Sequence, residues 1–333
     1  MISRIGGPEV LQVIEDDLQK PQPDQCRVRV LAAGVSYADI MMRKGMYPLP
    51  MPPTPYSPGS DIIGVIDELG ARVAHFEMGQ TVAALTRMGG YTQYLCLREA
   101  ELYPLPAGLD AAEAVCLPGN YVAAYQMLHR FANVKPGERI LVHGAAGGVG
   151  TALLQLGALA GLEMYGTASA PKHGLVSCLG ATPIDYRNED FVARIRDLSG
   201  SGVDAVFDHV GGTHLWRSFR TLRSGGRLIA YGEYSQIGKE RVNHIEKISQ
   251  AVLLRLLRYW PGKDVKWYEL DPGAGMIDPE WYRKDLMVLF DLLKQQKIRP
   301  VIASRMPLNE AARAHELIEN AAVCGRIVLL CSE

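Results

Sequence analysis

A glycine-rich turn between an apolar run and a helical pattern constrains this chain more than any other feature. The apolar residues 140–142 predict a buried parallel strand, and leucines recur at helical spacing over residues 153–159. The turn between them reads GAAGGVG, from Gly144 to Gly150. In such a unit, N–H groups at the helix start face the phosphates of a dinucleotide, and glycine lets the backbone come close. The alternative is a turn that only packs the helix on the sheet, because the spacing G-x-x-G-x-x-G is weak by itself.

The overall composition is that of an ordinary globular protein. The chain has 333 residues, which is enough for two domains, and is 48% hydrophobic and 21% charged. Its formal net charge of −1 disfavours nucleic acid as the main partner. No apolar stretch reaches the roughly 18 residues that span a bilayer, and the first residues lack the order of a signal peptide. The six cysteines are scattered without a C-x-x-C pair, as reduced thiols would be. We expect a cytoplasmic protein.

Strand and helix patterns predict an α/β fold with two domains. Residues 1–120 carry short strands, expected at 26–32, 62–69, 81–85 and 91–97. From residue 140 onward, strands at 140–142, 163–169, 204–208 and 227–232 alternate with helices, which indicates a doubly wound parallel sheet. After a helix at 284–296, strands at 301–303 and 325–330 flank a helix at 310–320. We expect a β-rich domain at 1–120 and 297–333 and a parallel-sheet domain at 121–296.

The end of the second parallel strand favours NADP over NAD. NAD-binding proteins usually place Asp or Glu about 20 residues past the glycines, to bond the ribose 2′-hydroxyl. Here the stretch 166–173 has no carboxylate and offers Ser169 and Lys172. A hydroxyl and an ammonium suit a 2′-phosphate. The alternative is that Ser169 only caps the next helix and Lys172 is solvated.

Residues 245–260 form a basic amphipathic pattern, IEKISQAVLLRLLRYW. Contact with a membrane surface is one interpretation. A helix over the active site or at a subunit interface is the other, and we favour it. Exchange of Leu253, Leu254 and Leu257 for polar residues would test membrane binding.

Several motifs in order resemble one known family over almost the whole chain. They are GVSYADIMMRKGMYP (34–48), GAAGGVG, GTAS with PK (166–172), IDYRNEDF (184–191) and VFDHVGG (206–212). The chain is similar to zinc-independent medium-chain reductases, above all zeta-crystallin-type quinone oxidoreductases. Vesicle-membrane-protein-like oxidoreductases and polyketide enoyl reductase domains are also similar. The resemblance implies a GroES-like catalytic domain with a Rossmann domain, an active site in the cleft between them, and a homodimer.

The positions of catalytic zinc ligands in related enzymes carry other residues here. Zinc-dependent relatives have cysteine in G-x-C-x-x-D and histidine-glutamate in G-H-E-x-x-G-x-V. This sequence has Ser36 in the first motif and Ser60 and Asp61 in the second, so the thiolate and imidazole ligands are gone. We expect no metal. Without a Lewis acid, the accessible reaction is hydride transfer to an electron-poor quinone, enone or enoyl thioester.

Three residues of the first domain are catalytic candidates by this resemblance. Tyr47 lies where related quinone and enoyl reductases carry a pocket tyrosine, and is the preferred proton donor or carbonyl-polarising group; packing is the alternative. Ser36 stands where many relatives have an asparagine facing the nicotinamide. Asp39 can act chemically or cap the following helix.

The glycine turn and the resemblance together imply an NADPH site. Its expected residues are Asn120, Ala146, Gly147, Gly148, Val149, Gly150, Ser169, Lys172, Tyr186, Val210, Gly211, Tyr231 and Gly232.

Three functions remain open at this point. The first is an NADPH-dependent reductase of quinones or activated double bonds, and the second is an enoyl-thioester reductase of a fatty-acid or polyketide pathway. The third is a non-enzymatic, NADPH-binding structural or membrane-associated protein.

Overall fold

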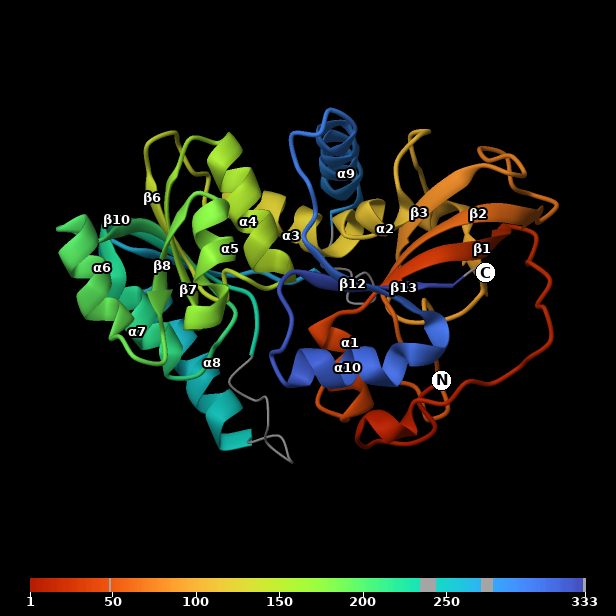
Figure 1. The fold of residues 1–333 in the computed structure, drawn as a ribbon, viewed down its shortest axis with the longest axis horizontal. Helices are drawn as coiled ribbons and strands as arrows, with labels where there is room; N and C mark the ends of the chain where they lie inside the picture. The colour runs from red at the N-terminus through yellow and green to blue at the C-terminus, as the bar shows by residue number, and fades with distance from the viewer. Residues whose placement is uncertain (48, 234–243, 271–277, 332–333) are drawn as a thin grey trace. The chain divides into compact units, whose positions relative to one another are not determined.

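A computed structural model describes residues 1–47, 49–233, 244–270 and 278–331 of the chain (Figure 1). The chain divides into two compact units: unit 1 is Met1–Val122 with Leu270–Glu333, and unit 2 is Ala123–Glu269. Pro48, from the motif that carries Tyr47, lies outside the described residues. The predicted α/β class is confirmed, because one sheet is parallel with helical connections and the other is largely antiparallel.

Unit 2 is a doubly wound sheet. Its order is β11-β10-β9-β6-β7-β8, and every pair is parallel. The strands are β6 (Arg139–Val142), β7 (Glu163–Ala168), β8 (Ala181–Asp185), β9 (Val203–Asp208), β10 (Leu222–Ala230) and β11 (Asp264–Trp267). Among the described residues, the connecting helices are α4 (Gly148–Leu159), α5 (His173–Cys178), α6 (Phe191–Ser199), α7 (His214–Thr221) and α8 (His244–Arg258). The direction of winding reverses between β6 and β9, and ligands bind beside such a reversal, outside the carboxyl ends of the strands.

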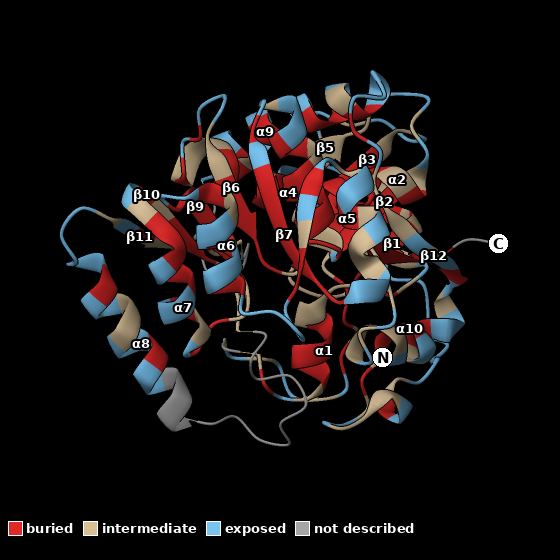
Figure 2. Ribbon diagram, turned by 60° about the vertical axis from the view of Figure 1, so that its left-hand side comes forward, coloured by how far each residue is buried: buried red, intermediate tan, exposed pale blue. Residues whose placement is uncertain are grey.

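The sequence of the central strands explains their place. All six residues of β9 are buried, and β6 buries Ile140, Leu141 and Val142 completely; both strands are covered on both faces, as parallel sheets require. Figure 2 shows this burial along β6 and β7. Strand β8 lies at the sheet edge, which is where the missing N–H of Pro183 does no harm. That proline and the shortness of the run left β8 without a strand prediction.

Unit 1 is built on a second sheet, of order β12-β13-β1-β2-β3-β5, with β4 paired to β1. The strands are β1 (Gln25–Gly34), β2 (Asp61–Leu69), β3 (Thr81–Leu85), β4 (Tyr94–Arg98), β5 (Tyr103–Pro104), β12 (Ile302–Pro307) and β13 (Arg326–Leu330). The main helices of its described part are α1 (Tyr37–Arg43), α2 (Ala111–Ala114), α9 (Pro279–Lys294) and α10 (Ala311–Glu319). Strand β13 pairs antiparallel with β1, so this late segment of the chain belongs to the same sheet of unit 1 as the early strands.

The predicted boundary at residues 296/297 needs a correction. The chain rejoins unit 1 earlier, at Leu270, and helix α9 belongs to that unit. The hydroxyl of Tyr282 on α9 donates to the carbonyl of Pro118 at 3.0 Å, and its ring packs at 5.1 Å from that of Tyr103. The amphipathic pattern of this helix predicted that one face is buried, but a pattern does not say against which domain.

The helical stretch at residues 111–131 is interrupted by two changes of helix type. After α2 come a π-helical turn, η3 (Leu117–Tyr121), the short helix α3 (Val122–Gln126) and a second π-helical turn, η4 (Met127–Phe131). Such turns are rare and are often found near functional sites.

None of the described helices is both long and apolar enough to cross a membrane.

Candidate functional site

Most of the predicted cofactor residues follow the carboxyl ends of neighbouring strands in unit 2. The turn Gly144–Gly150 follows β6, Ser169 follows β7, and Tyr186 follows β8. Val210 and Gly211 come after β9, and Tyr231 and Gly232 come after β10. Because all of these strands are parallel, the residues gather on one edge of the sheet, in the order of the strands.

The glycines of the turn are required by close backbone contacts. Gly144 has a φ of +61°, and helix α4 begins at Gly148 with Gly147 as its N-cap. A Cβ on Gly150 would collide with the carbonyl oxygen of Gly144, and one on Gly147 would lie 3.3 Å from the same atom. Ala146 is buried beneath the turn. The glycines therefore pack the turn on the helix, and they also leave the N-terminus of α4 without side chains that would keep an anion away.

The ends of β7 and β8 are neighbours in the sheet, and a serine, a lysine and a tyrosine follow them in the chain. Ala168 of β7 pairs with Asp185 of β8, so the next residues, Ser169 and Tyr186, are side by side. The N–H of Lys172 donates to the Ser169 carbonyl at 2.9 Å, within the 3-10 turn η5 (Ala170–Lys172) that follows β7. Ser169 is an N-cap residue by backbone conformation, but its side chain makes no capping bond.

Arg187 is a cationic residue that the sequence analysis did not select. Its guanidinium lies 5.8 Å from the centroid of the Tyr186 ring, and a hydrogen bond that it donates to the Tyr186 side chain raises the pKa of Arg187. The signal was present in the sequence, because Arg187 directly follows Tyr186. Its place at a strand end became clear only with β8.

The loop after β9 is shaped by a buried carboxylate. Asp208 accepts the N–H of Val210 at 2.8 Å and the N–H of Gly211 at 3.1 Å. Gly211 has a φ of +75°, and a Cβ there would lie 2.9 Å from the carbonyl of Gly232. The loops after β9 and β10 are therefore in close contact. The N–H of Tyr231 donates to the Asp208 carbonyl at 2.9 Å and continues the strand pairing.

In unit 1, Ser36 and Asp39 form a capping box at the start of α1. Oδ2 of Asp39 accepts the N–H of Ser36 at 2.7 Å and its hydroxyl at 2.8 Å, and the N–H of Asp39 donates to the Ser36 hydroxyl at 3.2 Å. Asp39 is fully buried and also accepts the N–H of Gly59 and the hydroxyl of Tyr91. Burial raises the pKa of Asp39, while the bonds from Ser36 and Gly59 oppose that rise. Asp39 thus has the capping role that the sequence allowed, and its contacts are with protein groups.

The position of the glutamate of zinc enzymes holds a buried ion pair here. Asp61 pairs with Arg326 of β13, and both side chains are 2% exposed. The hydroxyl of Ser60 contacts the same carboxylate at 3.4 Å. A Cβ on Gly119 would lie 2.6 Å from Oδ1 of Asp61, so the η3 turn packs directly on this pair. Asn120 is the next residue of that turn and is half-buried.

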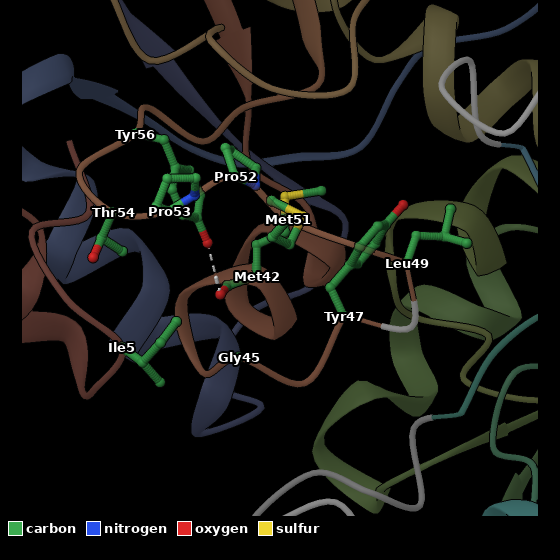
Figure 3. Close-up of a pocket in the computed structure, with 10 residues that line it drawn as sticks. All are labelled: Ile5, Met42, Gly45, Tyr47, Leu49, Met51, Pro52, Pro53, Thr54 and Tyr56. Carbon is green, nitrogen blue, oxygen red and sulfur yellow. Dashed lines mark hydrogen bonds between the residues drawn. The ribbon is translucent and has the colours of Figure 1, made fainter.

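Tyr47 lies at a cavity of about 310 Å³ within unit 1 (Figure 3). The lining is uncharged and consists of Ile5, Met42, Gly45, Tyr47, Leu49, Met51, Pro52, Pro53, Thr54 and Tyr56. Figure 3 shows Tyr47 and Leu49 at one end of the cavity and Ile5 with Thr54 at the other. The Tyr56 hydroxyl donates to the Met42 carbonyl at 2.9 Å. This bond joins α1 to the proline-dense loop at residues 49–55, which ends just before Tyr56.

A cation accompanies Tyr47 outside the cavity lining. The guanidinium of Arg87 lies 5.8 Å from the centroid of the Tyr47 ring and donates to the Pro50 carbonyl at 2.7 Å. Arg87 therefore connects the tyrosine to the proline-dense loop. Arg87 was not predicted from the sequence, because it is far from Tyr47 along the chain.

Comparison with known proteins shows the family of the chain. Residues 22–107 match the alcohol dehydrogenase GroES-like domain, and residues 179–329 match the zinc-binding dehydrogenase family. The quinone oxidoreductase of Pongo abelii is 30% identical over 336 residues, which are 99% of this chain and 96% of the relative. The chain belongs to the medium-chain dehydrogenase/reductase family. Within that family, the quinone oxidoreductase type fits it.

Two further relatives in the medium-chain family help to place the chain. A synaptic vesicle membrane protein VAT-1 homolog of Danio rerio is 34% identical over 311 residues; the match covers 91% of this chain but only 63% of that protein. The crystal structure of Escherichia coli quinone oxidoreductase complexed with NADPH superposes with a TM-score of 0.85 at 28% identity. That match covers 99% of this chain and 98% of the other. The oxidoreductase class of the prediction is thereby confirmed.

Proposed function

We propose that this chain is an NADPH-dependent reductase that transfers hydride to a quinone or to an activated, α,β-unsaturated carbonyl double bond. One observation carries the proposal. The carboxyl edge of unit 2 combines the glycine turn with hydroxyl and cationic residues that follow β7 and β8, namely Ser169, Lys172, Tyr186 and Arg187. No carboxylate follows β7 to bind a ribose 2′-hydroxyl.

The chain's own groups fit NADPH at each part of this edge. The exposed start of α4 suits the pyrophosphate, since its N–H groups face outward and the helix dipole favours an anion. Lys172 and Arg187 supply the positive charge, and Ser169 and Tyr186 the hydroxyls, that a phosphate monoester requires. Val210, Gly211, Tyr231 and Gly232 are left for the ribose and nicotinamide. The bound cofactor supplies the hydride, and the protein supplies orientation and a dry site.

We also propose that the reaction needs no metal. The Ser36 hydroxyl bonds to Asp39, and the Asp61 carboxylate is paired with Arg326, so two of the three positions that hold zinc in related enzymes are already committed to protein partners. Neither position offers the thiolate or imidazole that catalytic zinc prefers. Alcohol oxidation, which depends on a Lewis acid, is therefore not the activity we infer.

Tyr47 is the group we assign to polarise or protonate the acceptor oxygen. It offers a hydroxyl at an uncharged cavity, and Arg87 beside its ring favours the negative charge that develops on an oxygen during reduction. The uncharged lining favours a flat, neutral acceptor such as a quinone or an enone. An enoyl thioester is the second acceptor class, and relatives named quinone oxidoreductase make the first class the stronger candidate. We further propose a cytoplasmic homodimer, which sedimentation velocity would test.

The test is a screen for NADPH consumption with quinones, enones and enoyl thioesters. We expect steady NADPH oxidation with at least one quinone or enone, and loss of that activity in Tyr47→Phe. Turnover of enoyl thioesters alone would select the second acceptor class. Absence of turnover with all three classes would refute the reductase proposal.

The exposed face of α8 supports a second, non-enzymatic role at a membrane surface. Ile248, Val252 and Leu256 follow each other at four-residue spacing and are 64%, 52% and 64% exposed. Arg255 and Arg258 lie in the last turn of the same helix. An exposed apolar stripe with basic residues is typical of helices that bind anionic lipid surfaces.

The structure also changes the variants that test this role. Leu257 is buried, and Leu253 and Leu254 pack on the core of unit 2, so these leucines are on the wrong face for a membrane. Exchange of Ile248, Val252 and Leu256 for serine should abolish co-sedimentation with phosphatidylserine vesicles. Exchange of exposed Val288 on α9 for serine is the control. Wild-type protein that stays in the supernatant would rule the membrane role out.

A further inference from the structure

A buried group of polar side chains connects the two loops that we assign to the cofactor, and neither the motifs nor the proposed reaction accounts for it. The group consists of His143, Thr167, Asp208, His214 and Ser218. Four of these side chains are at most 3% exposed, and that of His214 is 19% exposed. They come from the ends of β6, β7 and β9 and from helix α7.

The spacing of His143, Asp208 and His214 would also suit a metal ion, because one ligand atom from each lies within 4.8 Å of the others. The hydroxyl of Ser218, however, occupies the middle of this set. It lies 3.0 Å from Nε2 of His143, 2.6 Å from Oδ2 of Asp208 and 3.4 Å from Nδ1 of His214. A cation would have to displace this hydroxyl, so the geometry is that of a hydrogen-bond network.

The direction of each hydrogen bond follows from the charge of Asp208. Burial raises the pKa of Asp208, but hydrogen bonds from His214 and Ser218 and the interaction with the neighbouring histidines lower it by more. Asp208 is therefore a carboxylate, which only accepts hydrogen bonds. Ser218 therefore donates its single proton to Asp208, and the Nδ1–H of His214 donates to the same oxygen at 2.9 Å. With its proton used, the Ser218 hydroxyl accepts the Nε2–H of His143.

The same logic fixes the tautomer of His143. Burial and the nearby His214 lower the pKa of His143 well below its ordinary value, so the ring is neutral and its Nδ1 is an acceptor. The Thr167 hydroxyl donates to this Nδ1 at 3.0 Å and accepts the N–H of Gly144 at 3.3 Å. The chain of bonds therefore starts at the first glycine of the turn.

At its other end the network reaches the loop after β9. The second oxygen of Asp208 accepts the N–H groups of Val210 and Gly211. Along the path from Gly144 through Thr167, His143 and Ser218 to Asp208, each hydrogen bond points the same way, and each group donates to the next one. Such directed networks act as a unit, since removal of one member leaves the next one unsatisfied.

From this arrangement we propose that His143, Thr167 and Ser218 are positioning residues, which hold the glycine turn and the Val210–Gly211 loop in register so that both contact one NADPH molecule. This inference rests on the proposed cofactor site. It predicts a selective defect: binding of whole NADPH suffers, while binding of its adenosine 2′-phosphate end, at Ser169, Lys172 and Arg187, does not.

The test compares NADPH with adenosine 2′-monophosphate, which lacks the pyrophosphate and the nicotinamide half. Fluorescence titration gives the NADPH affinity, and competition gives that of the fragment. Thr167→Val and Ser218→Ala should each weaken NADPH binding at least tenfold and change fragment binding less than twofold. The double variant should be no weaker than the worse single variant. Thr167→Ser keeps the hydroxyl and should restore wild-type affinity.

Equal losses for NADPH and the fragment, additive losses in the double variant, or unchanged NADPH binding would each overturn the inference. Wild-type protein that binds NADPH no more tightly than the fragment would also overturn the inference. If the wild type binds neither compound, the proposed cofactor site fails and the inference fails with it. Unchanged NADPH binding in the variants would refute the inference alone.

A measurement on the wild type covers the case in which the variants do not fold. The ¹⁵N chemical shifts of the His143 ring should show Nε2 protonated and Nδ1 bare, from pH 8 down to pH 6. A ring with Nδ1 protonated, or one that titrates in this range, would contradict the directed network.

Discussion

The carboxyl edge of unit 2 and the α1 region of unit 1 hold their candidate residues by different means. In unit 2 the residues follow strand ends, so the order β10-β9-β6-β7-β8 alone brings them to one edge. In unit 1, Ser36 and Asp39 cap a helix, Tyr47 lies on a proline-dense loop, and contacts distant along the chain define their surroundings. The difference suggests that a cofactor site can be deduced from local patterns, whereas an acceptor site depends on tertiary contacts.

The largest effect should come from the glycine turn, where backbone geometry leaves no freedom. Gly150→Ala places a Cβ against the Gly144 carbonyl and should weaken NADPH binding by about a hundredfold, or about 2.7 kcal/mol. Gly174→Ala is the matched control, because a Cβ at Gly174 meets open space in helix α5. Fluorescence titration, with circular dichroism to check the fold, gives both values. Normal NADPH binding by Gly150→Ala would show that the turn only packs the helix on the sheet.

Tyr47 tests whether the acceptor side is chemically separate from the cofactor side. Tyr47→Phe removes the hydroxyl and keeps the ring, so the turnover number should fall by about a hundredfold, as general acid catalysis supplies. NADPH affinity should stay within twofold. Tyr56→Phe is the control, because the Tyr56 hydroxyl is held by the Met42 carbonyl at the same cavity. Equal activity of wild type and Tyr47→Phe would leave the tyrosine with a packing role.

The next effect is on stability and tests how far unit 1 depends on distant partners. Burial, with the charge of Arg43 nearby, lowers the pKa of His315 to about 3, and its Nε2 bonds to the Tyr91 hydroxyl at 3.2 Å. Because the folded pKa lies below the unfolded one, the unfolded chain binds the proton more readily. The contribution of neutral His315 to the free energy of unfolding is therefore complete above pH 6.5 and is lost as the pH falls toward 3.

At pH 5 this loss should amount to about 2 kcal/mol for His315 alone. Urea unfolding at pH 7 and pH 5 measures it. His315→Gln removes the titrating group and should show a smaller difference between the two pH values. If the variant and the wild type lose the same stability, His315 is not held neutral by the fold.

The smallest effect should come from the cations that follow β7 and β8. Lys172→Ala and Arg187→Ala should each weaken NADPH binding by about tenfold, the value of one charge-assisted contact, and leave NADH binding unchanged. Lys284→Ala, at an exposed lysine of α9, controls for the loss of a positive charge. Equal losses for NADPH and NADH would place these cations away from the 2′-phosphate.

Local patterns predicted most of the fold, and the failures have physical causes. The strands β1, β2, β3, β4, β6, β7, β9, β10, β12 and β13 were all expected, because apolar runs between turn residues carry their own signal. β8 was missed because Pro183 weakens its pattern, and α9 was placed in the wrong domain because periodicity does not identify a packing partner.

The candidate sites show the same limit. The glycine turn, Ser169, Lys172 and Tyr186 could be named because each lies in a short motif. The network that begins with Thr167 and His143 could not, since its members are brought together by three strands and a helix that are distant in the sequence. Arg87 next to Tyr47 was missed for the same reason.

The central claim, that the edge of unit 2 is an NADPH site, is tested most directly by parallel fluorescence titrations of the wild-type chain with NADPH and NADH. We expect NADPH to bind at least about tenfold more tightly, because a 2′-phosphate between Lys172 and Arg187 adds at least one charge-assisted contact. Equal binding of the two nucleotides, or tighter binding of NADH, would contradict the account.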